Sequence, residues 1–84
     1  MEIQVECRPN EVGEETPSRL MLDGRVLEVA DVIDRWLARD HRYFKVRTAD
    51  GAIYILRHDE PSQRWELMMF ESPPRVRPTG AIVH

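Results

Sequence analysis

The sequence predicts a mostly β fold, a small antiparallel barrel or strongly curled sheet of about five strands, with one short helix as an alternative for a single segment. Three observations predict it. Several short segments alternate apolar with polar side chains, which is the period of a half-buried strand. Asp-Gly pairs at residues 23–24 and 50–51 separate such segments, as in tight hairpin turns. About five short strands in sequence, in a chain of 84 residues, are typical of one small barrel.

The N-terminal part begins with a strand and a loop. Residues 3–8 alternate apolar and polar side chains, and Pro9 is expected to end the strand. Residues 9–18 collect Pro, Gly, Asn, Thr, Ser and Glu around one apolar side chain, which predicts a mobile loop. Residues 20–29 then alternate on both sides of an Asp-Gly pair and predict a hairpin.

The segment 29–37 has two interpretations. Its apolar side chains recur at helical spacing, which allows a short helix. Its β-branched content and the lack of a Gly or Pro stop favour a strand. We favour a long bent strand with a bulge near Ala30-Asp31, because a bulge also explains why the alternation changes phase there.

Residues 43–56 form the clearest predicted hairpin, and the length of its turn decides which side chains face the core. A two-residue turn pairs Thr48 with Ile53, whereas a three-residue loop with a left-handed glycine pairs Thr48 with Ala52. We favour the three-residue loop, because its inner face is larger, more aromatic and better matched to the next strand. The inner residues are Phe44, Val46, Tyr54 and Leu56 with that loop, and Phe44, Val46, Ile53 and Ile55 with the shorter turn.

After Phe70 the chain changes character. Residues 71–84 contain three of the six prolines and predict a flexible tail, so the domain is expected to span residues 1–70. No apolar run approaches the length of a membrane helix, and the N-terminus does not resemble a signal peptide. We therefore expect a cytoplasmic protein without membrane contact.

No set of residues points to catalysis or to a cofactor. The single Cys7 excludes an internal disulfide, lacks the spacing of a zinc site, and is expected to pack as a small apolar residue. The four glycines are isolated from one another, so no phosphate-binding loop exists. Two short runs, Asp40-His41 and His58-Asp59-Glu60, do not chelate alone, because neighbouring side chains of an extended chain point apart. We expect no enzyme, metal or cofactor.

The charge distribution leaves one weak nucleic-acid hypothesis. The net charge of −3 argues against tight nonspecific binding, but the acidic residues are concentrated in residues 1–34. In either register of the hairpin, alternation places Lys45 and Arg47 away from the inner face. In the register of the favoured three-residue loop, Ile53 and Ile55 lie on the same outer side as these two basic residues. Such a mixed basic and apolar face is typical of small barrels that bind single strands. The alternative is that long basic stems merely cover the isoleucines. The residues of the hypothesis are Arg35, Arg39, Arg42, Lys45 and Arg47.

The two tryptophans are expected in the core, because a small domain needs most of its few aromatic side chains there. This expectation is firmer for Trp65. For Trp36 a contact role is the alternative, since Arg35 and Arg39 flank it.

A family pattern runs through residues 3–70. It comprises a short strand, an acidic linker with proline, an apolar strand ending in Gly-Arg, a Val-rich stretch ending in Trp, and three later motifs. The matching positions are Gly24-Arg25, residues 29–36, Phe44 with Val46, Gly51 with Tyr54 and Leu56, and Arg64-Trp65 with Leu67. The chain thus resembles a family of small uncharacterised bacterial domains. It differs in having Leu22 where an aromatic residue often stands, and in lacking an insert that some members carry after the Trp.

The resemblance implies no catalytic or ligand-binding residue. Some members of the family are encoded near error-prone DNA polymerase genes, which implies a link to DNA damage tolerance. The charge asymmetry between the two parts of the chain and the lack of a catalytic set predict a noncatalytic accessory binding module that contacts a protein partner. The contact surface would be the acidic first part of the chain or the face that carries Ile53 and Ile55. Weak nucleic-acid binding through the basic hairpin face is the alternative.

Overall fold

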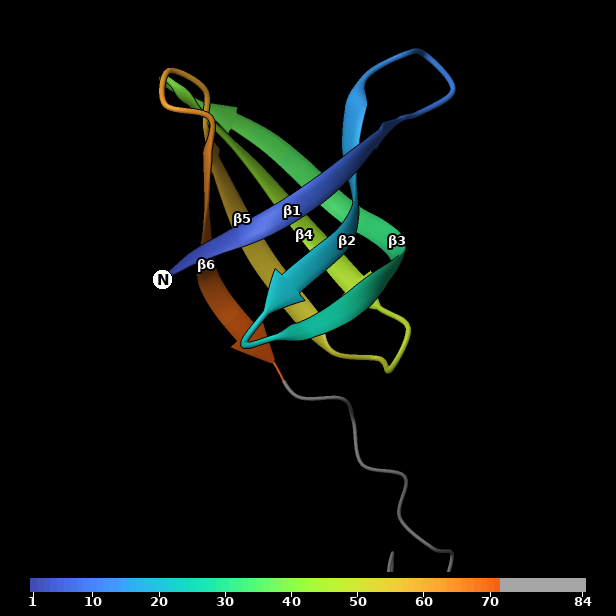
Figure 1. Ribbon diagram of the computed structural model, residues 1–84. Coiled ribbons are helices and arrows are strands. Elements are labelled where there is room, and N and C mark those ends of the chain that lie inside the picture. The colour runs from blue at the N-terminus through green and yellow to red at the C-terminus, as the bar shows by residue number, and fades with distance from the viewer. Residues whose placement is uncertain (72–84) are drawn as a thin grey trace, which may run out of the picture.

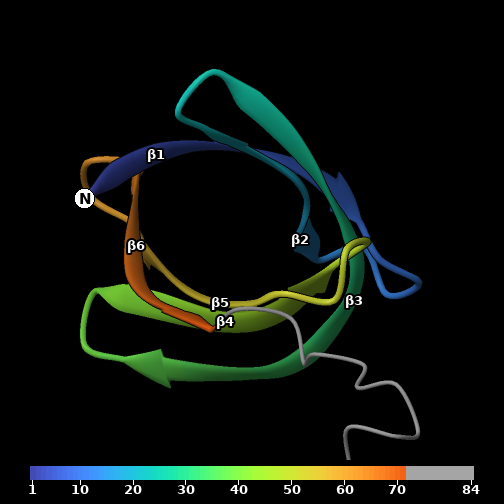
Figure 2. The same cartoon turned by 90° about the horizontal axis from the view of Figure 1, so that it is seen from below.

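The computed structural model describes residues 1–71, which form a closed antiparallel barrel without a helix (Figure 1). The strands are β1 (Glu2–Pro9), β2 (Glu15–Leu22), β3 (Arg25–Ala38), β4 (His41–Thr48), β5 (Ile53–Asp59) and β6 (Arg64–Glu71). Each strand pairs with the next, and β1 also pairs with β6, so the sheet closes on itself, as the view in Figure 2 shows. The predicted small antiparallel barrel is confirmed, with six strands where about five were expected.

The long strand β3 gives the barrel its shape. Its first residues, Arg25–Glu28, pair with β2, whereas Val29–Ala38 pair with β4. The register of the β3–β4 ladder shifts between Val29 and Asp31 and again between Val32 and Asp34. Bulges bend a strand and increase its twist, so β3 can pass from one neighbour to the other. The predicted bent strand with a bulge near Ala30 is confirmed, and a second bulge follows it.

The β4–β5 hairpin has the three-residue loop that the sequence favoured. The Thr48 amide donates to the Ala52 carbonyl at 2.9 Å, and Gly51 has a φ of 91°, in the region that favours glycine. This register turns the predicted inner residues toward the centre of the barrel. The buried apolar core consists of Ile3, Leu20, Phe44, Val46, Ala52, Tyr54 and Leu56.

The loop between β1 and β2 is shorter than predicted. The sequence indicated a loop over residues 9–18, but Pro9 belongs to β1 and β2 begins at Glu15. Pro17 lies in β2 beside a shift in the β1–β2 register, where a missing amide donor is tolerated. The Ser18 hydroxyl donates to the Glu6 carbonyl at 3.1 Å, so residues that are typical of loops are used here inside a ladder.

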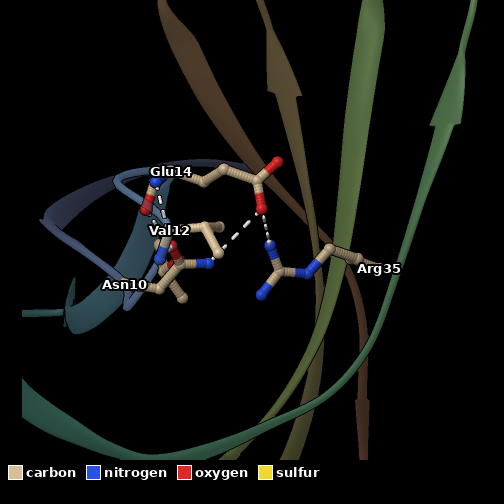
Figure 3. A network of polar contacts seen from close by, with 5 residues as sticks. Asn10, Val12, Glu14 and Arg35 are labelled. Atoms are coloured by element: carbon tan, nitrogen blue, oxygen red, sulfur yellow. Dashed lines mark hydrogen bonds and ion pairs between the residues drawn. The ribbon is translucent and has the colours of Figure 1, made fainter.

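The connection that remains, residues 10–14, is held by hydrogen bonds of the Asn10 backbone and side chain. The Asn10 Oδ1 atom accepts hydrogen bonds from the amides of Val12 at 3.0 Å and Glu14 at 2.9 Å (Figure 3). The predicted tail, residues 71–84, begins inside β6, because Glu71 is the last residue of that strand. The rest of the tail lies outside the described residues.

Candidate functional site

The strand register places twelve side chains on the surface of β3–β6 that faces away from the core. Directly paired residues project to the same side of a sheet, and their chain neighbours project to the other side. We call this surface the outer face. Its rows, read from β3 to β6, are Trp36, Tyr43, Arg57 and Glu66; Asp34, Lys45, Ile55 and Met69; and Asp31, Arg47, Ile53 and Glu71.

Apolar side chains occupy the middle of the outer face. Ile53 and Ile55 are half-buried, and Met69 is 57% exposed. At one end the rings of Trp36 and Tyr43 are stacked, with centroids 5.3 Å apart and an angle of 2° between their planes. The outer face therefore carries a preformed aromatic pair beside an aliphatic centre.

The expectation of a core position for Trp36 was wrong, since this side chain is 39% exposed. The two bulges in β3 change the phase of alternation, so that Arg35 rather than Trp36 pairs with the buried Phe44. Trp65 is half-buried and packs against the core, and its ring centroid lies 5.7 Å from that of Phe44. The expectation for Trp65 is confirmed to that extent.

Ion pairs lie at the margins of the outer face. Arg47 donates to Asp31 at 3.0 Å, and Arg57 pairs with Glu66. The hydrogen bond from Arg57 holds the pKa of the Glu66 carboxyl below its usual range, and the same bond raises the pKa of Arg57. Lys45 has no ion pair within residues 1–71. Most of the charge on this face is thus neutralised within the protein.

The five basic residues of the nucleic-acid hypothesis do not form one patch. Lys45 and Arg47 lie on the outer face, as alternation predicted. Arg35 and Arg42 lie on the opposite side, where their guanidinium carbons are 5.9 Å and 5.7 Å from the centroid of the Phe44 ring.

Two of these arginines have carboxylate partners as well. Arg47 pairs with Asp31, and Arg35 of β3 donates to Glu14 of the β1–β2 loop at 3.2 Å (Figure 3). Arg39 is exposed in the connection between β3 and β4. The basic side chains are therefore divided between two sides of the β3–β4 hairpin.

The β1–β2, β3–β4 and β5–β6 connections lie at one end of the barrel, at the top of Figure 1, and a cavity opens there on the inner side of the strands. We call this opening the mouth. It holds a cavity of about 400 Å³ lined by Cys7, Glu15, Arg42, Phe44, His58, Glu60, Gln63 and Trp65. The rings of His58 and Trp65 are stacked with centroids 4.4 Å apart, because these residues pair directly across β5 and β6.

The thiol that lines the mouth, Cys7, has low reactivity. Burial raises the pKa of the Cys7 thiol; Glu15 adds to this effect and Arg42 opposes it. The thiol is therefore protonated at neutral pH and is a poor nucleophile. No motif in the sequence indicates this cluster. The pairing of His58 with Trp65 was the signal that could have found it, since a short turn at residues 60–63 implies it.

Residues 1–71 contain no group of three or more His, Cys, Asp or Glu residues that could hold a metal ion. No helix in this part of the chain is long and apolar enough to cross a membrane. Comparisons with models of protein families, with curated proteins and with solved structures gave no match.

Proposed function

We propose that the protein is a noncatalytic binding module whose partner is another protein, and that the outer face of β3–β6 is the contact surface. The observation that carries this proposal is the apolar centre of that face, with the stacked Trp36 and Tyr43 at one end and ion pairs at its margins. Protein interfaces have this composition, with an apolar, aromatic centre inside a polar rim.

The physical properties of the outer face suit association. Tryptophan and tyrosine contribute more than their share of binding energy at interfaces. Because Trp36 and Tyr43 are already stacked, and because they lie on paired strands, little side-chain freedom is lost on binding. Because Arg47 and Arg57 have internal carboxylate partners, the partner protein need not supply countercharges to them. A partner surface that is mainly apolar and weakly charged fits best.

Nucleic-acid binding is the second candidate, and the described residues favour it less. Phosphate contacts need several free cations on one side of the protein. Here Arg35 and Arg47 pair with carboxylates, and Asp31 and Asp34 lie beside Lys45 and Arg47 in the outer face. The link to DNA damage tolerance that the family resemblance implies would then run through a protein contact.

The test uses immobilised full-length chain and a lysate of its source, with bound proteins quantified by mass spectrometry. The surface variant is Met69→Lys. The control is Val26→Lys, because Val26 is equally exposed, at 59% against 57%, but lies on the β2–β3 hairpin outside the outer face. We expect the lysate to contain a protein that is captured by wild type and by Val26→Lys but not by Met69→Lys. The same purified protein should then bind wild type at least about tenfold more tightly than the variant.

Two results would contradict the proposal. One is a partner that both variants retain equally. The other is concentration-dependent self-association of the pure chain that Met69→Lys abolishes, since the outer face would then join two copies of this chain. Single-stranded oligonucleotide is titrated in parallel. Binding that falls steeply with salt and is lost in the double variant Lys45→Glu with Arg47→Glu would put nucleic acid first.

A further inference from the structure

We propose that the mouth of the barrel is a second binding site, separate from the outer face, for a ligand that joins one carboxylate to an aromatic ring. Three features of the mouth carry this inference: a guanidinium group without a carboxylate partner among residues 1–71, a wall of stacked aromatic rings, and two carboxylates that limit the charge of the ligand.

The guanidinium group belongs to Arg42. It lies 5.7 Å from the centroid of the Phe44 ring, and it has neither an ion pair nor a side-chain hydrogen bond to any other part of residues 1–71. Arg42 lines both the mouth cavity and a neighbouring cavity of about 230 Å³. Contact with an aromatic ring leaves the planar N–H donors in place, and their fork matches the two oxygens of a carboxylate. Arg42 is therefore a ready anion-binding group beside open space.

The aromatic wall lines the same cavity as Arg42. His58 and Trp65 are stacked at 4.4 Å, and Trp65 is tilted by 37° against Phe44. Flat rings on a ligand pack well against such a surface in offset or tilted geometry. A cavity of about 400 Å³ is at the small end of the range for ligand pockets, which suits a single ring with a short side chain.

The remaining charges decide between a carboxylate and a phosphate. Glu15 and Glu60 line the mouth and have no basic partner within residues 1–71. Because Arg42 offsets one of these two carboxylates, the lining keeps an excess of one negative charge. A ligand carboxylate bound to Arg42 adds one further negative charge and a dianion adds two, so the single carboxylate is the less disfavoured of the two. The ligand is thus a monoanion. A free aromatic acid and the C-terminal carboxylate of a polypeptide that ends in an aromatic residue share this chemistry.

The test is an NMR titration of the full chain that follows the indole N–H signal of Trp65. The probes are phenylacetate for the free acid, N-acetyl-phenylalanine for the polypeptide end, N-acetyl-phenylalanine amide as the neutral control, and phenyl phosphate as the dianion. We expect the tighter of the two acids to bind at least about tenfold more tightly than the amide, as for the loss of one charged hydrogen-bonding pair. Which acid binds more tightly identifies the source of the carboxylate.

Variants separate Arg42 from general charge. Arg42→Gln should bind acid and amide equally, and Arg42→Lys should retain only part of the preference, because it keeps the charge without the fork. Arg39→Gln is the matched control, since Arg39 lies in the nearby turn and does not line the mouth; it should behave as wild type. The dispersion of each variant's own spectrum shows that it is folded. Equal affinity of wild type for acid and amide, tighter binding of phenyl phosphate, or an unmoved Trp65 signal would each overturn the inference.

Discussion

Substitution of two neighbouring residues of β5, Ile55 and Leu56, should affect stability and partner binding differently. Leu56 is 0% exposed and lies in the core, whereas Ile55 is half-buried on the outer face. Truncation of a fully buried leucine to alanine removes its transfer free energy and leaves a cavity, at a cost of about 3 kcal/mol. For Ile55→Ala the side chain is only partly withdrawn from water and no closed cavity forms, so the cost is about 1 kcal/mol.

Urea unfolding followed by tryptophan fluorescence measures both costs. With a slope of about 1 kcal/mol per molar urea for a domain of this size, Leu56→Ala should lower the midpoint by about 3 M and Ile55→Ala by about 1 M. Ile55→Ala should keep the fold but weaken the protein partner, whereas Leu56→Ala should spare the affinity of the molecules that remain folded. Equal destabilisation by the two substitutions, or a greater cost for Ile55→Ala, would refute this register of the β4–β5 hairpin.

Three further predictions follow from other contacts. Gly51→Ala should destabilise the protein by about 1–2 kcal/mol, as measured by the same urea midpoint, because its φ of 91° strains any side chain. Hydrogen bonds from the Thr48 hydroxyl and the Ala52 amide hold the pKa of the Asp50 carboxyl below its usual range. The stability that these bonds contribute is complete above the usual pKa range of a carboxyl and is lost as the pH falls through the lowered pKa. Asp50→Asn should therefore flatten the acid side of a curve of unfolding free energy against pH. Burial raises the pKa of the Cys7 thiol, so a chromogenic disulfide at pH 8 should react with it several-fold more slowly than with glutathione, and equal rates would contradict the half-buried position.

The architecture and the central hairpin could be predicted because local signals agreed with the packing. The Asp-Gly pair and the alternation on either side fixed a hairpin, and the larger inner face with Tyr54 and Leu56 distinguished the two turn lengths. The same alternation placed Lys45 and Arg47 outside. These inferences succeeded because the strands involved are paired on both sides, so a slip by one residue would expose the whole core face.

The errors arose where the ladder is irregular. Pro17 and Ser18 are typical loop residues, but both lie in β2 beside a shift in the β1–β2 register. The shift allows Pro17 to lack an amide donor, and the Ser18 hydroxyl donates a hydrogen bond to β1. One bulge in β3 was expected from the sequence. The second bulge, between Val32 and Asp34, changes the alternation of inner and outer side chains once more before Trp36. A bulge adds a residue without a compositional signal of its own. The side on which Trp36 lies therefore depends on the pairing with β4, which sequence periodicity does not contain.

The proposed site in the mouth is not indicated by any sequence motif, but its position follows from the inner faces of the strands. On β3, β4 and β5 the inner positions are apolar in the middle and become polar toward one end, at Arg35, Arg42 and His58. A polar side chain at an inner position is costly inside a closed core, so such residues lie where the barrel opens to water. Because β1 and β6 pair only at Glu2–Glu66 and Ile3–Trp65, the strands diverge beyond that point. Inner-facing polar residues at strand ends thus indicate where the core ends. They also indicate where a ligand can reach the aromatic wall of the mouth.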